Sequence, residues 1–320
     1  DTSTANWSGD TWDNGAPDDA VFGATGAGTV TLTEPITAGT VDISAGAYTI
    51  ASDTLTVNTL ITNSSVGACT ISSIIAGDGS ISHTGSGSLS LSGNNTFTGG
   101  VYSSGILGIY NNNALGTGPV EVNGGDLIGY ENLSIYNSIT LTNSSKLRVG
   151  TNGRTWTQYG DLHLNGTGLS ILTDNSANRN ASIRGNLYGF GSVSVGRGYL
   201  RIYSSCTNHY SGTFRLYRVG SGDTILEIGD EVNLTNDIAI ANSHHGNFRR
   251  IGLIDGSTSN TFSGDISISG SNKATADDGF QIYARAGETI TVSGEIVTGS
   301  SQDEGVDITG GGTVLLTGDS

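Results

Sequence analysis

The sequence predicts an all-β protein, a single right-handed parallel β-helix (β-solenoid). Three observations favour this fold class. Short runs in which apolar and polar residues alternate recur along all 320 residues, as in half-buried strands. Glycine is abundant, at 50 residues, and no apolar stripe of helical period is sustained, which disfavours helices. A degenerate repeat is also present, which is typical of a solenoid rather than of a meander or sandwich.

The alternating runs predict strands in order along the chain. Clusters of Gly, Asn and Asp separate the runs and supply turns that need positive φ. No stretch of 18 apolar residues occurs, which excludes a membrane-spanning helix. The clearest predicted strands are 29–33, 40–44, 88–92, 119–123, 161–164, 192–195, 265–269 and 288–292.

The repeat is plainest in three copies of the pattern Asn-x-aromatic-Ser/Thr-Gly. They begin at Asn95, Asn208 and Asn260. The asparagine suits a turn or a side-chain ladder, and the aromatic residue is expected to fold inward beneath the next coil. The pattern therefore predicts that Phe97, Tyr210 and Phe262 belong to the core.

The stretch 85–125 (GSGSLSLSGNNTFTGGVYSSGILGIYNNNALGTGPVEVNGG) resembles the passenger-associated transport repeat, also called the autotransporter-associated β-strand repeat. Residues 5–44 are similar to the amino-terminal segment of large surface proteins that carry this repeat. The resemblance implies a secreted surface β-helix. It does not imply autotransport by this chain, because no carboxy-terminal membrane barrel follows.

Two regions are expected. Residues 1–22, with Trp7 and Trp12, form an amino-terminal cap, and residues 23–320 form the β-helix, which ends in mid-repeat. An open end coil presents unpaired backbone groups, so end-to-end self-association through terminal coils is a further expectation.

Charge is distributed unevenly. The net charge is −16, yet residues 148–250 carry ten Arg against seven acidic residues. The negative total disfavours nucleic acid and membrane insertion as partners and leaves a polysaccharide or a surface protein. An extracellular or cell-surface location is expected from the composition. Cys69 and Cys206 lie several coils apart, which predicts two free thiols.

No catalytic, metal or cofactor site is predicted. The nearest approach to a polysaccharide-active enzyme is the pair Asp277-Asp278 together with His244-His245 and Arg249-Arg250. Adjacent aspartates on a strand point to opposite faces, which disfavours catalysis. The residues Asp13, Asp18 and Asp19 have no recognised calcium-loop spacing.

The predicted binding residues lie in the arginine-rich middle. Alternation directs Leu200 and Ile202 inward and places Tyr199, Arg201 and Tyr203 outside. The next run places Arg215 and Tyr217 outside in the same way. Exposed Tyr and Arg side chains suit sugar rings, acidic polysaccharide or a protein partner.

The function predicted is a non-catalytic extracellular or cell-surface β-solenoid scaffold that acts in adhesion or as a self-assembling fibre subunit. Two alternatives remain open, which are a polysaccharide lyase or glycoside hydrolase and an acidic-glycan-binding module. Carboxylates clustered in one groove would favour the enzyme, and an uninterrupted Tyr/Arg face would favour the scaffold.

Overall fold

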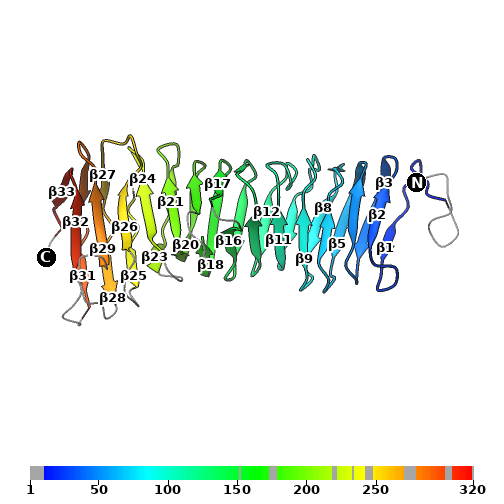
Figure 1. The fold of residues 1–320 in the computed structure, drawn as a ribbon, viewed down its shortest axis with the longest axis horizontal. Coiled ribbons are helices and arrows are strands. Elements are labelled where there is room, and N and C mark those ends of the chain that lie inside the picture. The colour runs from blue at the N-terminus through cyan, green and yellow to red at the C-terminus, as the bar shows by residue number, and fades with distance from the viewer. Residues whose placement is uncertain are drawn as a thin grey trace. The chain divides into compact units, whose positions relative to one another are not determined.

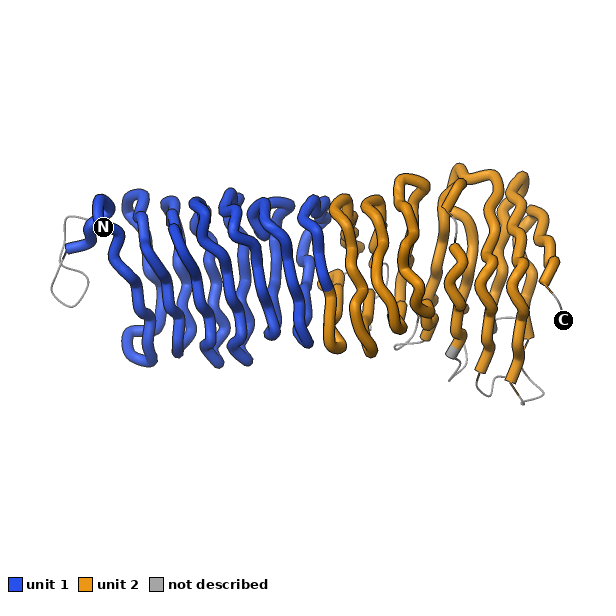
Figure 2. The backbone as a smooth tube through the Cα atoms, turned by 180° about the vertical axis from the view of Figure 1, so that it is seen from behind, with its two compact units in different colours: residues 1–140 blue, residues 141–320 orange. Residues whose placement is uncertain are grey.

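The computed structural model describes residues 11–150, 153–172, 179–217, 222–232, 234–241, 248–269, 279–299 and 305–318. The chain divides into two compact units, residues 1–140 and 141–320 (Figure 2). All secondary structure in the described residues is β-strand, and every strand pairing with a stated register is parallel (Figure 1). None of the described residues belongs to a helix that is long and apolar enough to cross a membrane.

Unit 1 contains strands of two to nine residues. They are β1 (Ala20–Phe22), β2 (Thr29–Leu32), β3 (Ile36–Ile43), β4 (Thr49–Ser52), β5 (Leu55–Asn63), β6 (Cys69–Ile71), β7 (Ile75–Ala76), β8 (Ser80–His83), β9 (Ser88–Leu91), β10 (Val101–Ser103), β11 (Ile106–Ile109), β12 (Val120–Asn123), β13 (Asp126–Gly129) and β14 (Leu133–Ile135). Strand β15 (Ile139–Thr142) lies across the boundary of the two units in sequence.

Unit 2 contains longer strands as well. They are β16 (Lys146–Val149), β17 (Thr155–Gln158), β18 (Leu162–Ile171), β19 (Asn180–Ile183), β20 (Leu187–Val195), β21 (Gly198–Ile202), β22 (Asn208–Tyr210), β23 (Thr213–Tyr217), β24 (Thr224–Ile228), β25 (Ile238–Ala241), β26 (Phe248–Leu253), β27 (Ser259–Phe262), β28 (Ile266–Ser269), β29 (Gly279–Ala284), β30 (Thr289–Val292), β31 (Ile296–Thr298), β32 (Val306–Gly310) and β33 (Thr313–Leu316).

The coils of unit 1 are nearly constant in length. Val41 pairs with Ile61, Ile61 with Ile81 and Ile81 with Val101, so equivalent residues are 20 positions apart. All four side chains are buried and form one apolar ladder through the core. Each coil thus covers the apolar face of the coil before it, which no single coil could bury alone.

Unit 2 repeats the arrangement with longer and less regular coils. Ala181 pairs with Leu200 after 19 positions, whereas Ile251 pairs with Ile282 after 31. Three sheets result, and each coil contributes a strand to more than one of them. We call β16, β18, β20, β22, β23, β25, β28 and β31 the first sheet, β17, β19, β21, β24, β26, β29 and β32 the second sheet, and β27, β30 and β33 the third sheet.

The prediction of an all-β parallel β-solenoid is confirmed in both units. The right-handed sense of the coil rests on the known chirality of parallel crossovers. Each predicted strand run coincides with an observed strand, usually displaced by one or two residues or contained in a longer strand.

The asparagine–aromatic repeat behaves as expected. Phe97, Tyr210 and Phe262 are each no more than 2% exposed. Asn95 accepts a hydrogen bond from the backbone N–H of Ile75 (2.8 Å) and donates one to the carbonyl of Ala114 (2.7 Å). The amide thereby ties its own coil to both neighbouring coils at a corner where the backbone ladder is interrupted.

The expected amino-terminal cap falls partly outside the described residues, because positions 1–10, including Trp7, are not among them. Trp12 is 5% exposed, and its indole N–H donates to the carbonyl of Thr37 at 2.9 Å. Asn14 donates to Pro35 O and accepts from Thr37 N, so residues 12–14 are fixed to the edge of β3.

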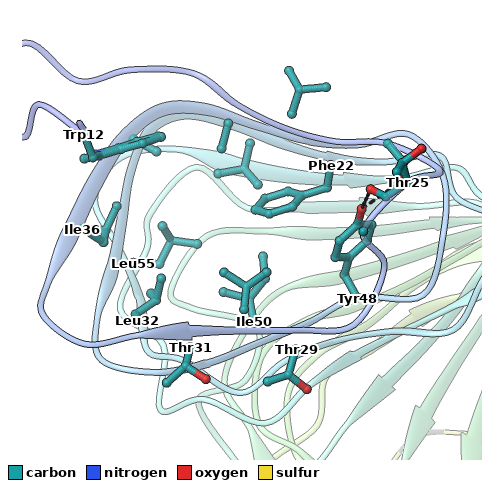
Figure 3. Close-up of a pocket in the computed structure, with 17 residues that line it drawn as sticks. Trp12, Phe22, Thr25, Thr29, Thr31, Leu32, Ile36, Tyr48, Ile50 and Leu55 are labelled. Carbon is teal, nitrogen blue, oxygen red and sulfur yellow. Dashed lines mark hydrogen bonds between the residues drawn. The ribbon is translucent and has the colours of Figure 1, made fainter. Parts of the chain in front are cut away.

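A cavity of about 520 Å³ lies inside the first coil beside Trp12 (Figure 3). Its wall combines the apolar residues Phe22, Leu32, Ile36 and Ile50 with threonines and backbone groups. Tyr48 closes one side, where its hydroxyl lies 2.7 Å from Gly23 O and 3.1 Å from Thr25 O. The cavity therefore lies at the amino-terminal end of the core that the described residues of unit 1 form.

Candidate ligand-binding face

The structure places the predicted binding residues on the outer surface of unit 2, in two groups. Tyr199 and Arg201 are on β21 and Tyr203 follows this strand, while Leu200 and Ile202 are buried. The alternation predicted for this run is therefore present.

Arg215 and Tyr217 are on β23, where Phe214 and Leu216 are buried between them. Strand β21 pairs with β19 and β24 in the second sheet, whereas β23 pairs with β20 and β25 in the first sheet. The chain turns a corner between the two strands. The five residues therefore form two separate groups, of three and of two, and no single strand pairing joins them.

A buried carboxylate organises the group on the second sheet. Glu227 on β24 is paired in register with Arg201 and is 3% exposed. Its Oε2 accepts from Arg201 Nε at 2.8 Å, and its Oε1 accepts from Arg285 Nη2 at 3.1 Å. One carboxylate thus holds two guanidinium groups, one from the preceding coil and one from two coils further along the chain.

The second of these ion pairs spans the coil that lies between its two partners. Gly252 on β26 lies in register between Glu227 and Tyr283. Arg285 follows β29, and its guanidinium reaches across the coil of Gly252 to Glu227, which is 58 positions earlier in the chain.

Arg285 is itself held by a second buried carboxylate. Its Nη1 donates to Glu288 Oε1 at 3.1 Å and to Leu253 O at 2.6 Å, and its backbone N–H donates to Glu288 Oε2 at 2.7 Å. Burial lowers the pKa of Arg285, but the hydrogen bonds to Glu288 and the charge of Glu227 outweigh burial and raise this pKa above its usual value. Arg285 therefore keeps its positive charge at physiological pH.

Arginine side chains also lie over aromatic rings at successive coils of the second sheet. The guanidinium carbon of Arg184 is 3.7 Å from the Tyr203 ring centroid, and that of Arg201 is 4.4 Å from the Tyr199 centroid. These distances are within the range of cation–π attraction. Further along, Arg250 lies 4.6 Å and Arg285 5.5 Å from the ring centroid of Tyr283.

We call this surface the arginine–aromatic face. Its members are Arg184, Tyr199, Arg201, Tyr203, Phe248, Arg250, Tyr283 and Arg285. Sequence reasoning found Tyr199, Arg201 and Tyr203 and missed the rest, because the stacked partners are contributed by different coils.

Arg184 differs from the other arginines of this face. Within the described part of the chain, its guanidinium has the Tyr203 ring as a neighbour but no hydrogen bond and no ion pair. Arg250, in contrast, donates from Nε and Nη2 to Gln281 Oε1 at 3.1 and 2.9 Å. A stacked guanidinium keeps its in-plane N–H donors available, which suits bidentate recognition of a carboxylate or sulfate.

The group on the first sheet has a different neighbourhood. Arg215 is exposed, and burial raises the pKa of Tyr217 despite an opposing hydrogen bond with Ser170. A ladder of stacked rings runs along the same sheet. The ring centroids of His163 and Tyr188 are 4.8 Å apart, and those of Tyr188 and His209 are 5.1 Å apart. Only the coil register, which pairs these residues on β18, β20 and β22, reveals the ladder.

Only some of the residues considered for catalysis belong to the described part of the chain. Asp277, Asp278, His244 and His245 lie outside the described residues. Arg249 is buried and Arg250 belongs to the arginine–aromatic face.

The amino-terminal aspartates are occupied by backbone hydrogen bonds. Asp13 Oδ1 accepts from Gly15 N at 2.7 Å, Asp18 Oδ2 accepts from Asp13 N at 3.1 Å, and Asp19 Oδ1 accepts from Thr40 N at 2.7 Å. Among the described residues, no group of three or more His, Cys, Asp or Glu side chains is placed to hold a metal ion. Asp13 and Asp18 thus stabilise a local turn, and Asp19 links its coil to the next one.

Both cysteines are free, as predicted, and both are buried. Burial raises the pKa of the Cys206 thiol to about 11. A thiol with so high a pKa is a poor nucleophile at neutral pH, so Cys206 belongs to the core rather than to a reactive site.

Comparison with known proteins finds one informative relative. The chain is 36% identical over 183 residues to the adhesin BmaC autotransporter of Brucella suis biovar 1 (strain 1330). The match covers 52% of this chain but 5% of the relative, so the chain spans a small fraction of that protein's length. No protein-family model and no solved structure matches the chain, and membership of the passenger-associated repeat family therefore stays a resemblance. The chain is thus a parallel β-solenoid similar to a segment of an autotransporter adhesin.

Proposed function

We propose that the chain is a non-catalytic β-solenoid of a secreted or cell-surface protein, and that it acts in adhesion. The similarity to an autotransporter adhesin and the solenoid fold support this role. We propose further that the arginine–aromatic face is the contact surface and that its ligand is an acidic glycan. The observation that supports this second step concerns Arg184. Its guanidinium is stacked on the ring of Tyr203, and its N–H groups donate no hydrogen bond to any residue that the structure describes.

The charge network supports binding rather than catalysis. A retaining or inverting glycosidase needs one carboxyl group as acid and another as nucleophile or base. The two buried carboxylates of this region, Glu227 and Glu288, both accept hydrogen bonds from Arg285. They serve to position arginines, and no carboxylate pair is left open to a substrate at this face of the described structure.

The test is binding to immobilised polysaccharides at two salt concentrations. The expected result is retention on a sulfated or uronate-rich glycan, weak retention on neutral dextran, and loss of binding as salt rises. Arg184→Gln should weaken binding at least tenfold, because it removes a guanidinium that makes no structural ion pair. Arg215→Gln, on the first sheet, is the matched control and should bind like the wild type. Equal binding of both variants and the wild type would refute the assignment of this face.

A self-assembling fibre subunit is the second proposal. The strands β31, β32 and β33 expose the apolar side chains Val297, Ile308, Leu315 and Leu316 to an extent of 44–55%. Such a surface could stack against a coil of another copy. Negative-stain electron microscopy across protein concentration tests this proposal, since filaments support it and particles of constant size at high concentration contradict it.

A further inference from the structure

A groove of about 350 Å³ crosses the outer surface of unit 1, away from any residue predicted to bind. It is lined by parts of β8, β10 and β12 and by Thr140. Its volume is at the lower end of the range found for small-molecule sites. The inward residues Ile81, Val101 and Val120 form the core beneath it. The groove therefore extends over four consecutive coils of the solenoid, those of β8, β10, β12 and β15.

The register places one aromatic ring at the centre of the groove wall. Tyr102 pairs with Ser82 on the preceding coil and with Glu121 on the following coil. Neighbouring strands are about 4.8 Å apart, so a hydroxyl, a phenol ring and a carboxylate follow one another along one face. Tyr102 is half-buried and Glu121 is exposed.

The hollow beside this wall is fixed by the backbone. Gly100 has a φ of +86° and accepts a hydrogen bond from the backbone N–H of Ile81 at 3.0 Å. A Cβ atom on Gly100 would approach the carbonyl oxygen of Pro119 to 2.5 Å. Glycine satisfies both constraints, and it lets the backbones at Gly100 and Pro119 approach each other in the lining of the groove.

The charge of unit 1 determines which ligand fits. Residues 1–140 contain twelve Asp and Glu and no Lys or Arg. No cation is available to hold a carboxylate or sulfate, and an anionic ligand would be repelled. The carboxylate of Glu121 has no hydrogen bond and no ion pair with any residue that the structure describes. It is free to accept hydrogen bonds from hydroxyl groups.

We infer that this groove is a binding site for a hexopyranose unit of a neutral glycan. A sugar ring has an apolar C–H face, which packs on the ring of Tyr102, and a rim of hydroxyls. Glu121 accepts from two adjacent sugar hydroxyls in charge-assisted hydrogen bonds, and Ser80, Ser82 and Thr140 supply further hydroxyl partners. This site lies in unit 1 and takes a neutral ligand, whereas the arginine–aromatic face lies in unit 2 and takes an acidic one. Each assignment can therefore be tested, and refuted, independently of the other.

Saturation-transfer NMR with neutral methyl hexosides, recorded on the whole chain, tests the inference. At least one neutral hexoside should show saturation transfer from the protein, with a dissociation constant in the millimolar range. The dissociation constant should be the same at low and high salt, because the ligand carries no charge. Tyr102→Ala and Glu121→Gln should each weaken it at least tenfold. Tyr136→Ala is the matched control, since Tyr136 is 68% exposed and lies outside the groove.

Three outcomes would overturn the site. They are no transfer to any neutral hexoside, transfer to amino or acidic sugars alone, and unchanged transfer in both Tyr102→Ala and Glu121→Gln. Glu121→Gln alters an exposed side chain and keeps the fold, so the test does not depend on Tyr102→Ala being stable. Arg184→Gln should leave neutral hexoside binding intact, which separates this site from the acidic-glycan proposal.

Discussion

Glu227 Oε2 accepts a hydrogen bond of 2.8 Å from Arg201 Nε on the neighbouring coil, and this glutamate is buried while the arginine is one-quarter exposed. The carboxylate is held in turn by Arg285, a further two coils along the chain. A buried acid that positions two partly exposed arginines gives the surface fixed donors, which cost little side-chain entropy when a ligand binds.

Glu227→Gln should destabilise the chain by about 2 kcal/mol. The substitution removes the charge that compensates Arg201 and Arg285, and hydrogen bonds to charged groups typically contribute about 1.5–3 kcal/mol. Both arginines remain partly solvated, which keeps the loss below that of a fully buried pair. Urea unfolding followed by circular dichroism measures the change. Glu121→Gln, an exposed glutamate, is the control and should stay within about 0.5 kcal/mol of the wild type. A wild-type midpoint for Glu227→Gln would show that the network does not contribute to stability.

Phe97→Ala should cost about 4 kcal/mol, within the usual range for a buried phenylalanine. Phe97 is fully buried beneath a corner of unit 1, where its truncation leaves a cavity that the close-packed coils cannot fill. Thr96→Ala changes the exposed neighbouring side chain of the same repeat and should be nearly neutral. Thermal and urea unfolding of the two variants compare them directly, and similar losses in both would contradict an inward role for the aromatic residue.

Stability should decrease as the pH falls from 7.5 to 5, with a contribution from His83. Burial lowers the pKa of His83 below 6.5, against opposing backbone hydrogen bonds with Asn63, Ile106 and Gly87. The unfolded chain therefore binds more protons than the folded chain in this window, so stability is complete above the unfolded pKa and is lost on acidification.

His83→Gln removes this proton and should flatten the dependence by at most about 1.4 kcal/mol per pH unit. The measurement is the free energy of unfolding at four pH values for the wild type and the variant, which share the other four histidines. Parallel curves for the two proteins would show that another group is responsible.

Cys206 should resist a disulfide reagent at pH 8 in the folded chain. With a pKa of about 11, roughly one thiol in a thousand is ionised at that pH, and the side chain is buried. Ellman's reagent should therefore report almost no fast-reacting thiol before denaturant is added and two thiols per chain afterwards. A rapid stoichiometric reaction in native buffer would mean that the thiol is accessible; Cys206→Ser would then identify the residue.

Local pattern was sufficient for much of the fold. Alternation placed Leu200 and Ile202 inside and Tyr199 and Arg201 outside, because side chains of a strand point to opposite faces in turn. The recurring Asn-x-aromatic pattern identified Phe97 as a core residue for a similar reason, since a large ring at a fixed position of each coil has only the core in which to pack.

The sequence could not specify which coils bring distant residues into contact. Arg201 meets Glu227 after 26 positions, and Arg285 meets Glu227 after 58. These separations in sequence depend on the lengths of the corner loops, and in unit 2 those lengths follow no regular repeat. Because of the corner between them, β21 and β23 belong to different sheets. The predicted tyrosine and arginine residues therefore lie in two groups.

The sequence by itself therefore determined the strands, the inward and outward faces, the free thiols and the contrast in charge between an acidic first unit and an arginine-rich middle. The tertiary structure alone decided which residues of different coils lie next to one another. Glu227 binds two arginines from different coils, and Tyr102 lies between Ser82 and Glu121 in the lining of the groove. The physical reason is that a solenoid makes its surface from residues one coil apart, and only the folded backbone fixes how long each coil is.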